Sequence, residues 1–445
     1  MKIKQFKDGP LAHYSYAIVS EGKMALVDPS RNPMQYYEYA EEQNAKITVV
    51  FETHPHADFV SSHLQISEQT GANIYVSKLL GADYKHISFD DGDSVKMGKV
   101  IFKGINTPGH SPDSITIVAE DSKKTILFTG DTLFIGDVGR PDLRENVGNM
   151  KAKRLELAKD MYRTMQNKYN HLPDEALVYP AHGAGSLCGK NMSNESSSTL
   201  GNERMGNWAF KKQTEAEFLE NILKDQPIIP SYFGFNVDLN KHGAENVQIS
   251  TSAVPLRFLV DEVEKGVLVV DTREEAIYKE GHFRNSINIM SRSDKDDFET
   301  WLGAIIKPEE AFYLVVNSIN DMEYVLERSA KIGYEKQIKA IVTLSDKVTV
   351  SSDKLDLNHF KKNPEDYTIV DIRSKSEVAS AKIFEDALSF PLNELRDSAD
   401  IIPADKPIVV HCAAGFRSAA GSSILENKFK NTRVYDLSDA IEKFK

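Results

Sequence analysis

The chain has 445 residues, more than one hydrophobic core usually holds, and about 150 residues per domain predicts three domains. Hydrophobic residues make up 41% and charged residues 27%, which excludes a disordered, collagen-like or coiled-coil protein. The net charge of −12 and the lack of a Lys/Arg cluster argue against nucleic acid or an anionic membrane surface as a partner. Small molecules or other proteins are the expected partners.

The cysteine count and the apolar runs bear on the cellular compartment. Only Cys188 and Cys412 occur, far apart in sequence, so the chain has no disulfide framework and a reducing cytosol is the default. The first eight residues contain no apolar segment of a secretory signal. The longest apolar runs, such as 267–270, have the length of a strand and cannot cross a bilayer. We expect a cytoplasmic protein that does not enter the membrane.

The first predicted domain, residues 1–245, alternates short β-rich runs with loops that carry histidines. Strands are predicted at 47–51, just before a histidine loop, and at 125–128, just before a Gly-Asp pair. Apolar residues at helical spacing predict a helix over 215–224, which Gln-Pro ends. Because a strand end holds the loop that follows it on a rigid frame, we expect the functional residues in these loops.

Beyond this domain the chain repeats itself with a period of 100 residues. The segment 268–273 reads LVVDTR, and 368–373 reads TIVDIR. Each copy has the order strand, Asp-x-Arg and charged helix, which is typical of parallel α/β structure. We therefore predict two parallel α/β domains, at 250–347 and 350–445.

The strongest chemical signal is the segment 53–59, Thr-His-Pro-His-Ala-Asp-Phe, directly after an apolar strand. A loop can turn its two imidazoles and its carboxylate to one side, and His with Asp is a ligand set for first-row metals. Three later segments, TPGH, FTGD and PAHG, add further donors. Scattered surface histidines are the alternative, but four such segments in order favour one metal site. The candidate residues are His54, His56, Asp58, His110, Asp131 and His182.

These four segments resemble the metallo-β-lactamase superfamily over about residues 1–240. The resemblance implies an αββα sandwich with the metal at one edge. Binuclear zinc hydrolases of the superfamily, such as glyoxalase II, normally have a histidine directly after the motif's aspartate, where this chain has Phe59. A binuclear hydrolase holds its attacking hydroxide between two metals. Phe59 therefore argues against hydrolysis.

The chain also resembles the persulfide dioxygenases of this superfamily, which implies one non-haem Fe(II) per domain, bound by His54, His110 and Asp131. Two imidazoles and one carboxylate leave positions open for a substrate sulfur and O₂. Ligand type alone leaves zinc open as the metal. The resemblance assigns three further residues to the surroundings of the ligands, where they orient ligands or handle protons. These are His56, Asp58 and His182.

The segment 135–142 also resembles the sequence pattern of the persulfide dioxygenases and contains Arg140 and Asp142. Arg140 either supports the metal loop through Asp142 or binds an anionic substrate.

Cys188 lies in a glycine-rich loop just after His182, where Lys190 could favour its thiolate. Resemblance to dioxygenases fused to two rhodanese domains implies that Cys188 lines the substrate channel or takes up sulfur. A loop cysteine without a role is the alternative.

Cys412 follows a predicted strand and opens the loop 413–418, with a helix expected from about Ala419. Loop N–H groups and a helix N-terminus aimed at the sulfur would lower the thiol pKa and stabilise a persulfide or a bound oxyanion. Arg417 adds a positive charge, whereas a buried structural cysteine is the alternative. The loop, with Asp-Ile-Arg at 371–373, resembles the rhodanese active loop. Its Cys-x4-Arg spacing, tighter than that of related phosphatases, favours sulfur transfer.

The middle copy lacks this chemistry. Aligned on the strands, it has Ser318 in place of the cysteine, Asp321 in place of the loop glycine and Glu323 in place of the arginine. The nucleophile is missing and the anion-binding charge is reversed. We therefore interpret residues 250–347 as an inactive rhodanese-like domain, kept for docking or support.

These resemblances span nearly the whole chain and imply an α/β multidomain enzyme with two activities. One would oxidise a low-molecular-weight thiol persulfide with O₂ to sulfite. The other transfers sulfane sulfur through Cys412 to sulfite and gives thiosulfate, which would serve sulfide and persulfide detoxification. We also expect a homo-oligomer. The alternatives are a binuclear zinc thioester hydrolase of the glyoxalase II type and a non-enzymatic sulfur carrier or sensor, and no motif identifies the thiol.

Overall fold

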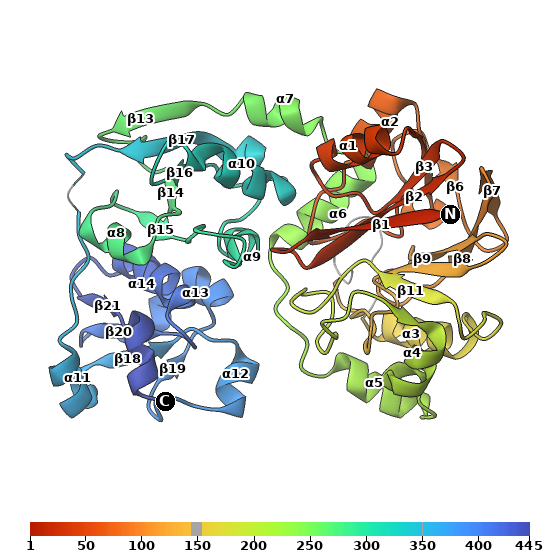
Figure 1. Cartoon of the computed structure of the whole chain (residues 1–445). Helices are drawn as coiled ribbons and strands as arrows, with labels where there is room; N and C mark the ends of the chain where they lie inside the picture. The colour runs from red at the N-terminus through yellow and green to blue at the C-terminus, as the bar shows by residue number, and fades with distance from the viewer. Residues whose placement is uncertain (144–153, 349) are drawn as a thin grey trace. The chain divides into compact units, whose positions relative to one another are not determined.

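The structure is a computed structural model that describes residues 1–143, 154–348 and 350–445 (Figure 1). Contacts between Cα atoms divide the chain into two compact units. Unit 1 comprises Met1–Ile249 with Ala330–Gly333, and unit 2 comprises Ser250–Ser329 with Tyr334–Lys445. Within the described ranges, no helix combines the length and the apolar character needed to cross a membrane.

Unit 1 contains two six-stranded sheets. The first has the order β1 (Lys2–Asp8), β2 (His13–Ser20), β3 (Lys23–Val27), β4 (Lys46–Phe51), β5 (Asn73–Val76) and β6 (Ile87–Ser88). The second has the order β12 (Ser198–Thr199), β11 (Leu177–Pro180), β10 (Thr125–Gly130), β9 (Ile115–Glu120), β8 (Val100–Asn106) and β7 (Ser94–Met97). Strands β3 to β6 run parallel to one another, as do β10 and β11, so several loops leave the same edge of a sheet.

The helices of this part of the chain are α1 (Met34–Glu42), α2 (His63–Thr70), α3 (Arg154–Asn167), α4 (Leu200–Gly206), α5 (Glu215–Leu223), α6 (Tyr232–His242) and α7 (Val247–Ser252). Helices α1 and α2 pack on the outer face of the first sheet, and α3, α4 and α5 pack on the outer face of the second. Short 3₁₀ helices lie at Lys78–Leu80 and Trp208–Phe210. The helix predicted over 215–224 is α5.

The core of unit 1 follows from the alternation of side chains along each strand. On β4, Phe51 packs between the sheets with Phe102 and Phe128, whereas its neighbour Val50 packs on the other face with Tyr36 of α1. The outer face of the second sheet packs in the same way against α3 and α5. The layers are therefore helix, sheet, sheet and helix, which confirms the predicted αββα sandwich.

Unit 2 contains two parallel sheets, as predicted. The first has the order β13 (Leu256–Val260), β17 (Ile338–Leu344), β16 (Phe312–Val315), β14 (Leu268–Asp271) and β15 (Ser286–Asn288). The second has the order β19 (Leu388–Ser389), β18 (Thr368–Asp371), β20 (Ile408–His411) and β21 (Val434–Asp436). We call these two halves of unit 2 the middle repeat and the last repeat.

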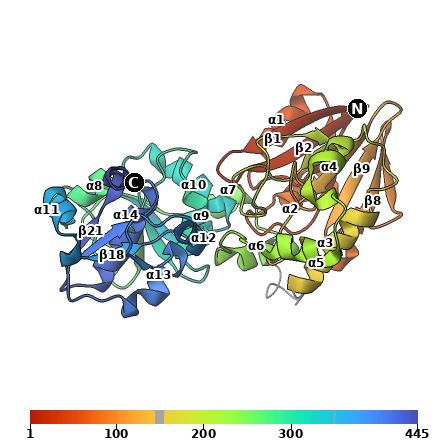
Figure 2. The same ribbon diagram turned by 90° about the horizontal axis from the view of Figure 1, so that it is seen from below.

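The middle repeat contributes α8 (Glu275–Glu280), α9 (Phe298–Ile305) and α10 (Asp321–Lys331). The last repeat contributes α11 (Leu357–Lys362), α12 (Lys375–Ser380), α13 (Leu392–Ser398) and α14 (Phe416–Lys428), of which α14 packs on β20 and β21 (Figure 2). Short 3₁₀ helices lie at Glu335–Gln337, Pro364–Asp366, Ala399–Ile401 and Ser438–Lys443.

The helix that follows the Cys412 loop begins at Phe416, so the expected start near Ala419 is wrong. Gly415 adopts a φ of 98°, which turns the chain directly into the helix. A β-carbon on Gly415 would lie 2.7 Å from the backbone nitrogen of Asp439, so glycine is also required for this close approach. The loop is shorter than the sequence suggested.

Candidate functional site

Three side chains from three strand ends converge at one edge of the unit 1 sandwich. His54 follows β4, His110 follows β8 and Asp131 follows β10. Asp131 Oδ2 lies 3.6 Å from His54 Nε2 and 3.5 Å from His110 Nε2. One donor atom from each of the three buried residues lies within 4.8 Å of the others. The structure thus brings together the three residues that the sequence suggested as ligands.

The residues present fit a mononuclear metal. Asp131 Oδ2 is buried and receives no hydrogen bond from the described part of the chain, although buried carboxylate oxygens are normally satisfied. The Nδ1 atoms of His54 and His110 face away from Asp131. His110 Nδ1 donates to Arg140 O at 2.9 Å, and His54 Nδ1 lies 3.1 Å from Thr53 Oγ1. Both Nε2 atoms therefore face the carboxylate, and a first-row divalent metal suits this donor set.

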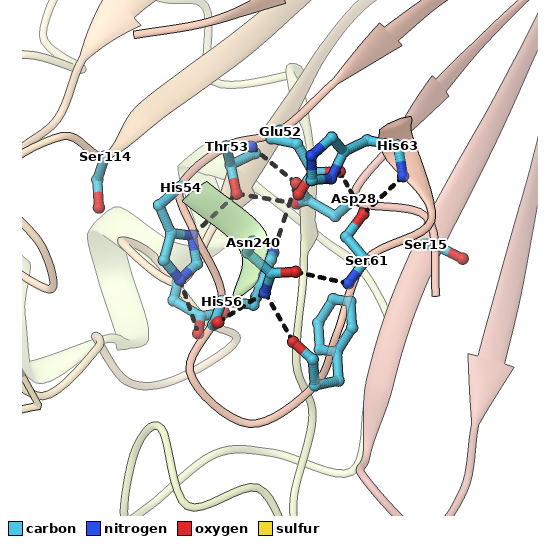
Figure 3. A network of polar contacts seen from close by, with 12 residues as sticks. Ser15, Asp28, Glu52, Thr53, His54, His56, Ser61, His63, Ser114 and Asn240 are labelled. Atoms are coloured by element: carbon cyan, nitrogen blue, oxygen red, sulfur yellow. Dashed lines mark hydrogen bonds and ion pairs between the residues drawn. The ribbon is translucent and has the colours of Figure 1, made fainter. Parts of the chain in front are cut away.

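Asp28, which the sequence reasoning missed, anchors the start of the metal loop (Figure 3). Its carboxylate accepts hydrogen bonds from Thr53 N at 2.7 Å and Thr53 Oγ1 at 2.9 Å. Asp28 Oδ1 also lies 3.4 Å from His56 Nε2. Burial alone would lower the pKa of His56, but the Asp28 carboxylate raises it. The signal for Asp28 was its position after a buried strand, the same position that Asp131 occupies.

Asn240 on α6 holds the same loop by its backbone, as Figure 3 shows. Its Nδ2 donates to His56 O and Phe59 O, both at 2.8 Å, and its Oδ1 accepts from Ser61 N at 2.8 Å. Asn240 is 1% exposed, so these bonds are shielded from water. Three hydrogen bonds from one side chain fix the path of the loop beyond His54.

A second group of polar side chains lies beside the three candidate ligands. His182 Nδ1 lies 2.7 Å from Asp131 Oδ1, and His182 Nε2 lies 2.8 Å from Asp58 Oδ2. Burial alone would lower the pKa of His182, but the two carboxylates raise it well above its usual value. Donor atoms of Asp58, His182 and Cys188 lie within 4.8 Å of one another, as do those of His56, Asp131 and His182.

His13, at the start of β2, is a further imidazole at this place that no motif indicated. Its ring lies 4.0 Å from the Phe59 ring and 5.4 Å from the His182 ring, between centroids. Burial, followed by the charges of His182 and His56, lowers the pKa of His13 well below its usual value. A neutral imidazole and a phenyl ring therefore lie side by side next to His182.

Cys188 lies in this group, but Lys190 does not stabilise its thiolate as expected. Lys190 Nζ donates to Asn221 O at 2.6 Å and to Lys224 O at 2.7 Å. Burial, followed by the charges of Asp58 and Asp131, raises the pKa of Cys188 well above its usual value. The expectation that Lys190 favours a thiolate is therefore wrong, because carboxylates rather than cations surround the sulfur.

Arg140 ties together the loops around the candidate ligands. It is 1% exposed and binds Asp142 through Nε at 2.6 Å and Nη2 at 2.8 Å. Its Nη1 donates to Leu187 O at 3.2 Å and Ile228 O at 3.3 Å. Its backbone carbonyl also accepts the hydrogen bond from His110 Nδ1, so Arg140 contacts several of the loops around the candidate ligands.

In unit 2, Cys412 follows β20, and its Sγ accepts a hydrogen bond from Gly415 N at 3.1 Å. Cys412 is 1% exposed and lies before the N-terminus of α14, a 13-residue helix. Backbone N–H groups at a helix N-terminus stabilise negative charge. The Cys412 sulfur therefore lies at the end of a strand and before a helix N-terminus, in contact with a backbone N–H group.

Arg417 does not stand alone as a positive charge, because Glu377 on α12 binds it. Arg417 Nη1 and Nη2 donate to the two Glu377 oxygens at 2.8 and 2.7 Å. The hydrogen bond from Arg417 lowers the pKa of Glu377 to about 2. The sequence reasoning missed Glu377, although its capping box with Ser374 is visible as Ser-x-x-Glu.

The middle repeat keeps part of this arrangement. Arg273 Nη2 lies 2.7 Å from Asp271 Oδ2, as Arg373 and Asp371 do at 2.6 Å in the last repeat. In the loop that corresponds to the Cys412 loop, Asp321 Oδ2 accepts from both Ser318 N at 2.9 Å and Ser318 Oγ at 2.8 Å. An internal carboxylate thus occupies this loop.

The sequence was compared with known families and proteins. Residues 8–182 match the metallo-beta-lactamase superfamily, and residues 258–342 and 356–445 match the rhodanese-like domain. Over 142 residues the chain is 32% identical to human mitochondrial persulfide dioxygenase ETHE1, covering 32% of this chain and 51% of the human protein. Over 164 residues it is 34% identical to hydroxyacylglutathione hydrolase of Rhizobium etli, covering 36% of this chain and 57% of that protein. The chain thus spans about half the length of these curated relatives.

Among solved structures, a metallo-beta-lactamase from Staphylococcus aureus superposes with a TM-score of 0.67 at 29% identity. The match covers 77% of this chain and 99% of that one. The matched ranges follow the two-sheet unit and the two parallel sheets that the structure contains. The chain therefore carries a metallo-β-lactamase superfamily domain followed by two rhodanese-like domains.

Proposed function

We propose that residues 1–245 oxidise a low-molecular-weight thiol persulfide with O₂ to sulfite at one Fe(II) held by His54, His110 and Asp131. The observation that carries this proposal is the buried convergence of these three donors. The similarity of this domain to persulfide dioxygenase ETHE1 supports it. The same donors would also accept zinc.

The reaction consumes one persulfide, one O₂ and one water, and yields one thiol, one sulfite and two protons. Bound iron would supply the redox chemistry and open coordination positions for the persulfide sulfur and O₂. The chain itself orients the ligands: the Arg140 carbonyl fixes His110, and Asp28 through Thr53 fixes His54.

Three buried residues, His56, Asp58 and His182, surround the proposed ligands. We assign His182 to hold a proton between Asp131 Oδ1 and Asp58 Oδ2, because it lies within 2.8 Å of both. His56 is the counterpart on the other side, held by Asp28. These residues keep Asp131 oriented and supply places where the released protons can stay.

Cys188 lines the substrate side of this site in our proposal. Its thiol is buried, and its raised pKa keeps it protonated at neutral pH. A protonated thiol suits a channel wall for a sulfur substrate better than it suits a nucleophile that takes up sulfur.

We propose that residues 350–445 transfer sulfur through Cys412, with 250–347 as the inactive copy. A Cys412 persulfide and sulfite would give the Cys412 thiol and thiosulfate, which balances all atoms and charges. The hydrogen bond from Gly415 N to Sγ and the N-terminus of α14 support an anionic sulfur here. Arg417 is the cation that would meet sulfite. We further place the protein in the cytoplasm as a homo-oligomer.

Oxygen uptake tests the first activity, since an iron-loaded protein should consume O₂ when a thiol persulfide is added. Cys412→Ser tests the second activity, because it should shift the product from thiosulfate to sulfite without changing oxygen uptake. Unchanged thiosulfate in this variant would remove Cys412 from the mechanism. Absence of oxygen uptake by the iron-loaded protein would refute the first activity.

A second candidate function is thioester hydrolysis at two zinc ions. The similarity to hydroxyacylglutathione hydrolase favours it, as does the group of Asp58, His182 and Cys188 beside the first site. Two zinc ions per chain together with thioester cleavage would support this function. A chain purified without any metal would instead indicate a sulfur carrier or sensor.

A further inference from the structure

The two ends of the metal loop are joined by a hydrogen bond between two buried side chains (Figure 3). Ser61 Oγ donates to Glu52 Oε1 at 2.6 Å. Glu52 directly follows β4, and Ser61 lies two residues before α2, so the bond encloses the segment 53–60. Glu52 is 2% exposed and Ser61 is 1% exposed, so water does not compete for the bond. We call this pair of residues the clasp.

Each residue of the clasp is itself fixed to a regular element. Glu52 N donates to Tyr75 O on β5, the strand beside β4, at 3.2 Å. Ser61 N donates to Asn240 Oδ1 on α6 at 2.8 Å. Ser61 Oγ also accepts from His63 N, at the first residue of α2, at 3.2 Å. The clasp therefore ties the end of the loop to a strand and to two helices.

The enclosed segment brings two different groups to the candidate site. Near its start, His54 Nε2 lies 3.6 Å from Asp131 Oδ2. Further along, Asp58 Oδ2 lies 2.8 Å from His182 Nε2. An anchor at the start of the loop alone would let the second half swing and carry Asp58 away from His182. A bond that joins the two ends reduces the number of loop conformations, so both groups stay in place together.

We propose that Ser61 and Glu52 are positioning residues that place His54 and Asp58 for the metal site at the same time, before a metal binds. This inference rests on the proposed mononuclear metal at the three candidate ligands. Both residues of the clasp act through the path of the loop and not as ligands. Groups that orient metal ligands in this indirect way change metal affinity about 10- to 100-fold when they are removed.

Co²⁺ is the probe for this role, because its visible absorption depends on the number and arrangement of its ligands and it binds imidazole and carboxylate. Ser61→Ala should change the Co²⁺ spectrum and release Co²⁺ to a chelator about tenfold faster than the parent. Ser61→Thr keeps a hydroxyl at this position and should restore both properties. The matched control is Ser67→Ala on α2, where the hydroxyl donates to Ala72 O at 2.7 Å, and it should change neither property.

A double-mutant cycle tests whether the two residues act through the one bond. Glu52→Gln keeps the shape of the side chain but weakens the bond, because a carboxylate accepts more strongly than a neutral oxygen. It should release Co²⁺ about two- to threefold faster than the parent. Adding Glu52→Gln to Ser61→Ala should cause no further increase, because the bond is already absent. Effects of the two substitutions that combine in full would overturn the proposal.

The outcomes separate this inference from the function on which it rests. If Ser61→Ala has the Co²⁺ spectrum and the release rate of the parent, the clasp does not position the loop, whatever the activity of the protein. If the iron-loaded parent consumes no O₂, the proposed oxidation is wrong, and the Co²⁺ measurements still decide on the clasp. Should Ser61→Ala fail to fold, Glu52→Gln provides the test, and release at the rate of the parent would overturn the proposal.

Discussion

Glu426, in the joint between the two repeats, should make the stability of unit 2 depend on pH. It lies on α14 among the side chains of Tyr278, Lys279 and Asp436, and its Oε2 accepts from Ser352 Oγ at 3.2 Å. Burial, and then the nearby carboxylates of Asp436 and Asp353, raises the pKa of Glu426 from 4.5 to about 7. Lys279 pairs with Asp436 at 2.7 Å and so offsets only part of this repulsion.

The size and sign of the effect follow from this pKa. Below pH ~4.5 the carboxyl group is protonated in both the folded and the unfolded chain, and folding has no cost from its charge. As the pH rises towards 7, the unfolded chain releases this proton while the folded chain keeps it, so stability falls. A shift of one pKa unit corresponds to about 1.4 kcal/mol of folding free energy. Because the Glu426 side chain is not fully buried, we expect the free energy of unfolding to fall by about 2–3 kcal/mol, and the fall is complete above pH ~7.

Glu426→Gln removes this loss because glutamine carries no charge at any pH. Urea unfolding of unit 2, followed by Trp301 emission in a Trp208→Phe background, should show equal stability of variant and parent at pH 4. At pH 8 the variant should be about 2–3 kcal/mol more stable. Glu385→Gln, whose side chain is 88% exposed, is the control and should show no such pH-dependent gain. A stability difference for Glu426→Gln that is the same at pH 4 and pH 8 would refute the reasoning.

Three further predictions concern single contacts. Phe59→His would restore an imidazole beside Asp58, so metal analysis should find two metal ions per chain rather than one; an unchanged ratio would contradict our explanation of the single site. Asn240→Ala removes three hydrogen bonds from the metal loop. It should lower the free energy of unfolding of unit 1 by about 2–4 kcal/mol and speed metal loss in dialysis, and retention equal to the parent would count against its role. Arg328→Met leaves the buried Glu299 carboxylate without the guanidinium at 2.8 Å. It should destabilise unit 2 by about 3–5 kcal/mol in urea, and an effect below 1 kcal/mol would show that the pair is replaceable.

The sequence predicted the fold class because its signals are local. Strand-length apolar runs precede His54 and Asp131, and the 100-residue repeat exposes two equivalent parallel sheets. The three candidate ligands could be named because each lies in a segment that resembles a motif of the superfamily and follows a strand end, and strand ends meet at one edge of a sheet. His13 and Asp28 lie at the same place without such a motif, so the sequence did not reveal them.

The supporting residues could not be predicted, because their contacts join segments far apart in sequence. Asn240 lies 184 residues from His56, and no periodicity or motif links them. The predicted effect of Lys190 on the Cys188 thiolate was wrong for the same reason. Lys190 is close to Cys188 in sequence, but its ammonium group donates to the carbonyls of Asn221 and Lys224.

The central claim is that one iron, held by His54, His110 and Asp131, oxidises a thiol persulfide. The most direct test combines metal analysis with oxygen consumption across a panel of low-molecular-weight thiol persulfides. We expect one iron per chain and one O₂ consumed for each sulfite formed, with oxygen uptake lost in His110→Ala. Two zinc ions per chain, thioester cleavage and no oxygen uptake by the iron-loaded protein would contradict it.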